Sequence, residues 1–229
     1  MRKQSGFTLI EIAIVLVIIG LLLGGVLKGQ ELITSARVRN LISQQDGIKA
    51  AYFGFLDRFR ALPGDYSQAT TNIAGATTNG NNNGQIKSIA GGDAVDEQIA
   101  VWEHLSRSGF INGSYTYAAG AETPTSAPTN PYARYLQLIY DNVYAGTASL
   151  RHNLKTGNQI PSDILAEVDR KIDDGVADGG TFRFSVYAGQ TSGGGTAPTG
   201  AAAATCYIAA AGPWNAAAPV NNCGAASLF

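Results

Sequence analysis

The sequence predicts an α+β protein in which one long N-terminal helix packs on a globular head with an antiparallel sheet and short helices. Three observations predict this fold. The run from Phe7 to Leu27 is almost wholly apolar and long enough to cross a membrane as a helix. Residues 28–62 then carry apolar side chains at alternating steps of three and four, which is the spacing of one helix face. Later segments alternate apolar and polar residues, which is typical of strands.

The composition restricts the class of protein. Of the 229 residues only 14% are charged, and the net charge is −1, whereas soluble domains average roughly 25% charged residues. This balance argues against nucleic-acid binding through bulk electrostatics. Glycine is abundant, with 28 residues, and Ala, Thr, Asn and Ser fill the second half of the chain. We therefore expect a loop-rich domain outside the cytoplasm.

The apolar run has the features of a membrane anchor. At the rise of an α-helix, its roughly 21 residues span the hydrocarbon layer. Arg2 and Lys3 precede the run, which favours a cytoplasmic N-terminus. A secretory signal would have a shorter apolar core followed by a small-residue cleavage site, and this run has neither. The sequence therefore predicts a transmembrane helix at residues 7–27.

Glu11 lies within this run, and a carboxylate in a bilayer helix normally needs a compensating partner. No basic residue lies within a helical turn or two of it. Cleavage after Gly6 would create a partner, because the new α-ammonium group of Phe7 lies one turn from Glu11. In a polymer of parallel chains, the amine of one subunit could instead meet Glu11 of the next. The charge would then be compensated only on assembly, which would set the register of the helices.

The stretch KQSGFTLIE resembles the cleavage and methylation motif of type IV prepilins and of type II secretion pseudopilins. The resemblance implies that residues 1–6 are a leader, that prepilin peptidase cuts after Gly6, and that Phe7 becomes the methylated N-terminus. It also implies that Glu11 is the carboxylate used in assembly. The close match covers roughly residues 1–35, ahead of the head.

The chain departs from many major pilins, which carry a proline late in this helix that helps it to melt locally in the fibre. No proline precedes Pro63, and glycines stand at positions 20, 24, 25 and 29 instead. Each glycine weakens a helix by roughly 1 kcal/mol relative to alanine, so Gly24-Gly25 is the expected soft point. Glycines equally serve close helix packing in membranes. The sequence leaves both interpretations open.

The amphipathic segment continues the same helix. Pro63-Gly64 ends it, and we expect residues 28–62 to lay one face on the head, residues 63–229. A free coiled coil is the alternative, but the many later apolar residues need a partner surface. The predicted face consists of Val38, Leu41, Gln45, Ile48, Tyr52, Phe55, Phe59 and Leu62.

Several segments of the head have a clear pattern. Residues 64–92 are rich in Thr, Asn and Gly and are expected to form a loop. Apolar residues at helical spacing predict helices, and alternating or aromatic-rich segments predict strands. The predicted helices are residues 93–105 and 161–175, the second with Ser162 as N-cap, and the predicted strands are residues 133–146, 181–189 and 205–212.

Cys206 and Cys223 lie close together near the C-terminus. Outside a reducing compartment such a pair usually forms a disulfide, and the membrane segment argues against the alternative of two free thiols in the cytosol. The bond would close a loop of about 18 residues. The loss of chain entropy in the unfolded state would then stabilise the fold by roughly 3 kcal/mol. It also resembles the disulfide-bounded C-terminal region of many pilins.

Asn79, Asn81 and Asn83 occupy alternate positions, as oxygen ligands do in the first half of an EF-hand-like calcium loop. Asparagine replaces each usual aspartate, and Ala90 stands where such a loop ends in an acid, so calcium would bind weakly. A polar Asn-Gly turn is the alternative. A second acidic group is open to the same two interpretations and consists of Asp173, Asp174 and Asp178.

No catalytic constellation is apparent. His104 and His152 are far apart in sequence, and we find no Ser-His-Asp order, metal-spaced His/Cys set or phosphate-binding glycine loop. The sequence therefore predicts a structural subunit rather than an enzyme, with no cofactor apart from the calcium hypothesis. The expected partners are other pilin subunits, prepilin peptidase and the inner membrane.

The resemblance implies an inner-membrane precursor that is cleaved and polymerised into a filament at the cell surface or in the periplasm. A type II secretion pseudopilin, which forms a short periplasmic fibre, is the alternative within the family. From a different class, the alternative is a membrane-anchored periplasmic binding protein that never polymerises. Such an anchor has no use for Gly6-Phe7 or for Glu11. The choice between major and minor subunit, and between adhesion, motility, DNA uptake and secretion, stays open.

Overall fold

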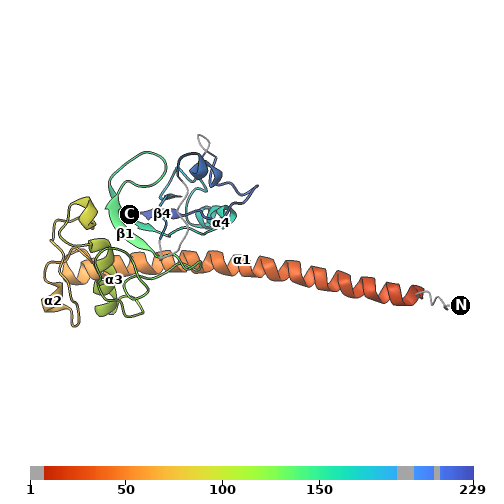
Figure 1. Cartoon of the computed structure of the whole chain (residues 1–229), viewed down its shortest axis with the longest axis horizontal. Helices are drawn as coiled ribbons and strands as arrows, with labels where there is room; N and C mark the ends of the chain where they lie inside the picture. Colours follow the sequence, from red (N-terminus) through yellow and green to blue (C-terminus); the bar gives the residue numbers. More distant parts are fainter. Residues whose placement is uncertain (1–7, 190–198, 209–211) are drawn as a thin grey trace. The chain divides into compact units, whose positions relative to one another are not determined.

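The computed structural model describes residues 8–189, 199–208 and 212–229. The chain forms two compact units, one ending at Arg37 and the other extending from Val38 to Phe229. The predicted α+β class is confirmed, because a long N-terminal helix is followed by a head with a four-stranded antiparallel sheet and short helices (Figure 1). The predicted division into leader, anchor, amphipathic segment and head concerns processing and membrane contact, and it stays a prediction.

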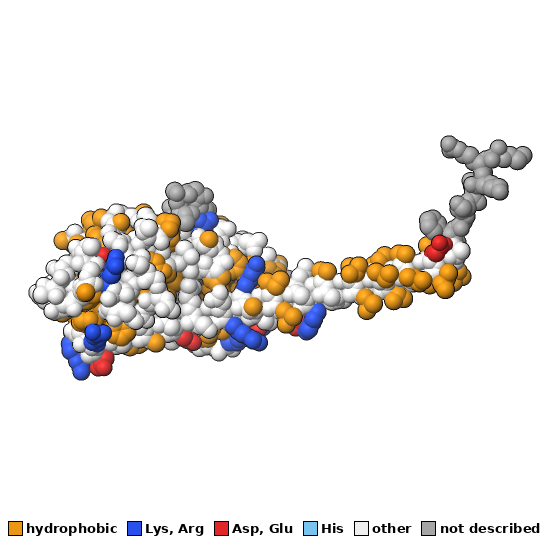
Figure 2. Space-filling model, turned by 90° about the horizontal axis from the view of Figure 1, so that it is seen from below, with side chains coloured by type: hydrophobic (Ala, Val, Ile, Leu, Met, Phe, Trp, Pro, Cys, Tyr) orange, Lys and Arg blue, Asp and Glu red, His pale blue; other side chains and the backbone are white. Residues whose placement is uncertain are grey.

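Helix α1 (Leu9–Phe59) is 51 residues long and passes through Gly24-Gly25 without a break. Up to Arg37 its large apolar side chains are exposed, Leu9 to 88%. Figure 2 shows hydrophobic side chains along this part of the helix on the face in view. Within the described residues, α1 is the one helix long and apolar enough to cross a membrane, by length and composition.

The predicted apolar face of α1 is confirmed within the head unit, where its residues from Val38 to Phe55 are all buried. Gln45 is buried with this face, and its side-chain amide has no hydrogen-bond partner among the described residues. The helix ends at Phe59, earlier than Leu62, because Arg60 adopts a left-handed conformation with φ of 54°. The chain thus leaves the helix before Pro63 can interrupt it.

The sheet has strand order β1-β2-β4-β3, and every neighbouring pair is antiparallel. Strands β1 (Gln137–Asp141) and β2 (Arg151–Lys155) are adjacent in sequence and pair directly. Strand β4 (Ala225–Leu228) comes from the C-terminus and lies between β2 and β3 (Phe182–Phe184). Figure 1 shows β4 inside the head with the C-terminus at its end.

Two short helices of the head match the predicted segments with shifted ends. Helix α3 (Glu97–Arg107) begins four residues later than predicted, and α4 is Ser162–Ile172. The N-cap position of α4 is Pro161, so the prediction of Ser162 as N-cap was wrong. The Ser162 hydroxyl instead donates to Asn215 O at 2.7 Å and accepts from Val220 N at 3.0 Å. It therefore holds the C-terminal segment rather than the helix end.

The predicted strand at residues 205–212 was wrong over its described part. Gly200–Thr205 forms a 3₁₀-helix, η2, and Tyr207 makes only an isolated bridge with Trp214. Strands β2 and β4 escaped prediction because neither has a regular alternation, and all four residues of β4 are buried. The predicted loop at residues 64–92 contains two further short turns of helix, α2 (Ala69–Asn72) and η1 (Ile89–Gly91).

Two groups of buried apolar side chains form the core of the head. One surrounds Phe55 and includes Trp102 and Leu154, and the other includes Leu41 and Phe182. Residues of α1 contribute to both groups. The head is therefore assembled along the buried face of this helix.

Candidate functional site

Glu11 helps to start helix α1. Its carboxylate Oε2 accepts a hydrogen bond from Thr8 N at 2.8 Å and another from the Thr8 hydroxyl at 2.6 Å. In return, Glu11 N donates to the Thr8 hydroxyl at 3.3 Å, and Thr8 O accepts from Ile12 N at 3.4 Å. This reciprocal arrangement is a capping box, which pairs two of the N–H groups that a helix start leaves without partners.

The capping box was not foreseen, although the spacing T-x-x-E from Thr8 to Glu11 predicts it. Both side-chain bonds go to Oε2, and no described residue bonds to Oε1 of Glu11. The carboxylate therefore has a local role within the single chain and retains one oxygen for another partner. Gly6 and Phe7, the predicted cleavage and methylation residues, lie outside the described residues.

The three asparagines of the proposed calcium loop fold back on their own chain. Asn79 Oδ1 accepts from Thr70 N at 2.9 Å, and Asn81 Oδ1 accepts from Asn83 N at 2.9 Å. Asn83 Oδ1 accepts from Gln85 N at 2.8 Å. Asn81 and Asn83 thus accept from the backbone two residues on, as is typical of asparagine in turns, whereas Asn79 joins the loop to α2.

Three carboxylates converge on the same loop. Asp65, which the sequence did not single out, accepts from Asn83 N and from the backbone N–H that follows it, both at 2.8 Å. Glu97 accepts from Asn81 N at 3.0 Å. Asp93 Oδ1 accepts from the side-chain amides of Asn81, at 2.8 Å, and Asn83, at 3.2 Å. Asp93 Oδ2 is buried and has no partner within the described residues.

Two of these carboxylates, Glu97 and Asp65, have raised pKa values, chiefly because they are buried. Burial, with smaller contributions from the charges of Asp65 and Asp93, raises the pKa of Glu97 to about 8. Burial also raises the pKa of Asp65. Because the folded pKa of Glu97 is raised, its contribution to stability is complete below about pH 4.5 and is lost as pH rises through about 8. The loop is therefore a place where added positive charge would stabilise the fold.

The buried polar residues of α3 hold the neighbouring loops. Glu103 accepts from Thr77 N at 2.9 Å and from Tyr117 N at 3.1 Å. His104 Nδ1 accepts from Gly64 N at 2.9 Å, and Nε2 lies 3.1 Å from Thr78 O. These contacts fit the neutral imidazole, with Nε2 as the donor, and burial lowers its pKa. Both residues therefore act as structural hydrogen-bond partners.

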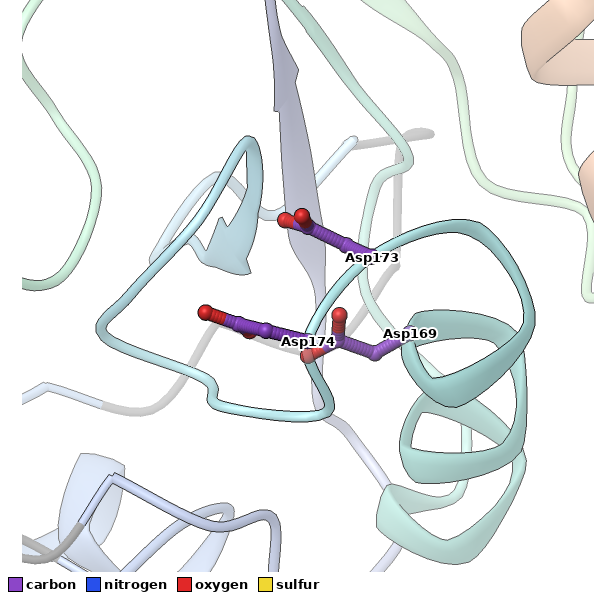
Figure 3. A group of neighbouring side chains, drawn as sticks. All are labelled: Asp169, Asp173 and Asp174. Carbon is purple, nitrogen blue, oxygen red and sulfur yellow. The ribbon is translucent and has the colours of Figure 1, made fainter.

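A second acidic cluster lies at the end of α4. One carboxylate oxygen from each of Asp169, Asp173 and Asp174 lies within 4.8 Å of the others (Figure 3). The sequence had grouped Asp173 and Asp174 with Asp178, whereas the described structure places the buried Asp169 there. Asp169 was missed because it reads as one polar position in an amphipathic helix.

Donors from the chain itself already engage these carboxylates. Asp169 accepts from Trp214 Nε1 at 2.6 Å, Asp173 accepts from Phe182 N at 2.8 Å, and Asp174 accepts from Val176 N at 2.9 Å. The cluster thus ties the end of α4 to β3 and to the C-terminal segment. Burial raises the pKa of Asp169 to about 6.

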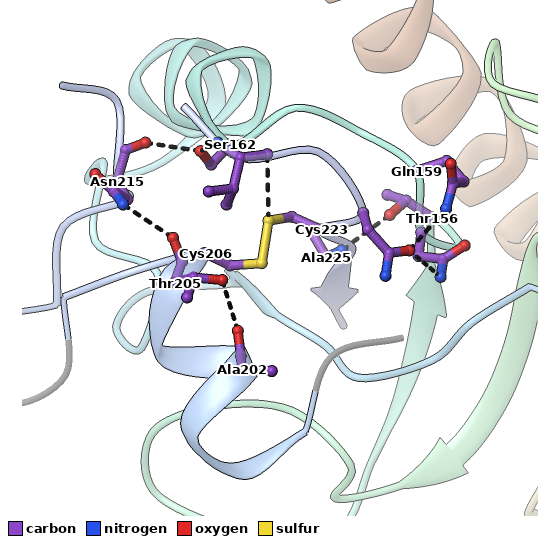
Figure 4. The surroundings of a disulfide bond; sticks show 12 residues. Thr156, Gln159, Ser162, Ala202, Thr205, Cys206, Asn215, Cys223 and Ala225 are labelled. Carbon is purple, nitrogen blue, oxygen red and sulfur yellow. Dashed lines mark hydrogen bonds between the residues drawn. A yellow bond between two sulfur atoms is a disulfide. The ribbon is translucent and has the colours of Figure 1, made fainter. Parts of the chain in front are cut away.

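Cys206 and Cys223 form the expected disulfide, with Cα atoms 5.8 Å apart and both residues fully buried. Cys223 exchanges two backbone hydrogen bonds with Ile160, at 3.0 and 3.1 Å. Figure 4 shows the bond between the segment after η2 and the segment that leads into β4. The disulfide therefore anchors the end of η2 to the segment that precedes β4.

Among known families, the model described as the prokaryotic N-terminal methylation motif matches residues 1–27. The chain carries the type IV pilin and pseudopilin signal. This match confirms the resemblance seen in KQSGFTLIE, and it points to a structural protein of the pilin or pseudopilin kind. No curated protein and no solved structure matches the chain.

We predict that Asp169 makes the stability of the head depend on pH. Its folded pKa is raised from 3.8 to about 6, so its contribution to stability is complete below about pH 4 and is lost as pH rises through about 6. Asp169→Asn carries no charge at any pH. Its free energy of unfolding relative to that of wild type should therefore rise by up to about 3 kcal/mol between about pH 4 and about pH 7. Urea unfolding at the two pH values measures this gain.

Asp178→Asn, outside the cluster, is the control and should track wild type at both pH values. The comparison uses the change with pH, so a constant loss from the altered Trp214 hydrogen bond does not affect it. An equal pH dependence in wild type and Asp169→Asn would contradict the prediction.

Proposed function

We propose that this chain is a structural subunit of a type IV pilus-like filament, processed by prepilin peptidase after Gly6 and polymerised through the N-terminal part of α1. The methylation motif at residues 1–27 carries this proposal. In that family signal, the residue that becomes the methylated N-terminus after cleavage corresponds to Phe7. The subunit would begin as an inner-membrane precursor and end in a filament at the cell surface or in the periplasm.

The apolar surface of α1 supports both stages. From Leu9 to Leu27 the large apolar side chains are exposed around the helix, and a helix that is apolar on all sides needs a membrane or other helices around it. Burying one such side chain is worth roughly 1.5–3 kcal/mol. In lipid this surface is already solvated, so packing and specific contacts, rather than the hydrophobic effect, must direct helix association. Glu11 is the polar group available for such a contact.

Among the described residues, the capping box leaves only one carboxylate oxygen of Glu11, Oε1, without a hydrogen bond and thus available for a contact between subunits. Its Oε2 caps the helix in the single chain, and Oε1 can accept from the α-ammonium group of a neighbouring subunit's Phe7. One residue would then serve both the helix start and the register of subunits. The two roles need different chemistry, since capping needs an acceptor oxygen and the subunit contact needs a charge.

Cleavage tests the first step of the proposal. Coexpression with prepilin peptidase should yield a mature chain that begins at Phe7, because Gly6 is the small residue at the cytoplasmic edge of the apolar run. Intact mass and N-terminal sequencing check this outcome. Replacement of Gly6 by a bulky residue should leave the leader attached. A wild-type chain that still begins at Met1 beside an active peptidase would refute the filament proposal.

Two matched substitutions separate capping from assembly. Glu11→Gln keeps an acceptor oxygen for Thr8 and removes the charge, so insertion should remain normal while fibre yield falls to background. Thr8→Ala removes the hydroxyl of the capping box and keeps the carboxylate, so fibres should still form. The measurement is the ratio of sheared fibre to inner-membrane subunit for each variant.

A normal fibre yield from Glu11→Gln in a filament of this subunit alone would show that the charge is dispensable. Loss of fibre only in Thr8→Ala would assign the carboxylate to capping. A pseudopilin would pass the same tests with a fibre confined to the periplasm. The anchored binding protein would insert and form no fibre under any condition.

We also propose that the loop around Asn81 binds calcium, with carboxylates as the main ligands. The convergence of Asp65, Asp93 and Glu97, together with the buried and unpartnered Oδ2 of Asp93, favours this candidate. The amide oxygens of Asn79, Asn81 and Asn83 accept hydrogen bonds from the backbone. We therefore expect the three acids, rather than these asparagines, to be the main calcium ligands. A divalent ion would offset their mutual repulsion.

Calcium should then raise the melting temperature by mass action. The rise should grow from about pH 6 to about pH 8, because Glu97 must release its proton to bind the ion. Asp93→Asn should abolish the rise, and Asp57→Asn, an exposed acid on α1, should preserve it. A calcium response that is the same in Asp93→Asn and wild type would exclude this site.

A further inference from the structure

The chain contains three Asn-Gly pairs, Asn79-Gly80, Asn83-Gly84 and Asn112-Gly113. In such a pair the backbone nitrogen of glycine can attack the side-chain amide of asparagine, because glycine offers no side chain to block the approach and adopts many backbone angles. All three asparagines are exposed. Exposure and sequence therefore do not distinguish the three pairs.

Hydrogen bonding does distinguish them. Gly80 N donates to Tyr66 O at 3.0 Å, and Gly84 N donates to Asp65 Oδ2 at 2.8 Å. The amide oxygens of Asn79 and Asn83 are also engaged, by Thr70 N and Gln85 N. In both pairs the attacking nitrogen and the attacked amide are therefore held in place.

The third pair lies in the irregular segment after α3. Gly113 is exposed with φ of 107°, and among the described residues no group accepts a hydrogen bond from its N–H. The side-chain amide of Asn112 likewise has no hydrogen bond within the described ranges. Neither reacting group is therefore held by a hydrogen bond within the described residues.

We propose that Asn112 is a site of spontaneous deamidation in the folded protein, and that the folded loop protects Asn79 and Asn83. Gly113 N attacks Cγ of Asn112, a new C–N bond closes a five-membered succinimide, and the side-chain nitrogen leaves as ammonia with the proton of Gly113 N. Water then opens either carbonyl of the ring. The products are aspartate and isoaspartate at position 112, and neither needs an enzyme or a cofactor.

The change would alter a defined part of the head. Asn112 lines a cavity of about 510 Å³ beside α1, together with Gln44, Phe110 and Tyr115. Each conversion adds one negative charge there, which takes the net charge of the chain from −1 to −2. The isoaspartate product also lengthens the main chain by one carbon. An ageing subunit would thus acquire a new charge at this cavity without any change in the Asn loop.

Peptide mass mapping of the purified full chain, kept in detergent at mildly alkaline pH, tests the proposal. The peptide with Asn112 should gain about 1 Da over time, and conversion at Asn79 and Asn83 should be at least about tenfold slower because their hydrogen bonds must first open. The matched control is the same protein, reduced and unfolded in urea, where all three sites should convert at similar rates. Asn112→Ser should abolish the mass gain of this peptide in the native protein.

Equal rates at the three sites in the folded protein would overturn the proposal. So would faster conversion at Asn79 or Asn83, or a preference for Asn112 that persists unchanged in urea, since sequence rather than folding would then explain it. These results are independent of whether the chain forms a filament.

Discussion

The head depends on the burial of one face of helix α1. From Val38 to Phe55 this face is covered, and it contributes to both groups of apolar core residues. From Leu9 to Leu27 the same helix exposes apolar side chains on all sides. One continuous helix therefore serves two environments, and the pattern of apolar residues changes where the environment changes. The backbone needs no break, because helical hydrogen bonds are satisfied within the segment in either setting.

Hydrogen bonds to buried polar groups hold the loops of the head in place, as the burial of apolar side chains holds α1. The carboxylates of Asp65, Glu97 and Glu103 each accept backbone N–H groups from a glycine- and asparagine-rich region that has few apolar side chains to bury. Such a region keeps one conformation because its donors are paired. The cost appears as raised pKa values for Glu97 and Asp65, since burial disfavours their charged forms.

The capping of α1 shows how one residue can meet two demands. A carboxylate near the start of an apolar helix is unfavourable in lipid, yet Glu11 pairs with Thr8 and so completes the helix start. Its position near the N-terminus also suits the positive end of the helix dipole. The local geometry therefore gives Glu11 a role in helix formation, whereas the assembly role that we propose for it rests on the family signal.

The sequence by itself determined the N-terminal signal, the buried face of α1, helices α3 and α4, strand β3 and the pairing of Cys206 with Cys223. All of these depend on local periodicity, on a short motif or on the presence of only two cysteines. Only the tertiary structure decided that β4 lies between β2 and β3, that Asp65 joins Glu97, and that Asp169 joins Asp173. Those contacts join residues far apart in the chain, and their partners are selected by packing and by the need to pair buried donors, which no local pattern records.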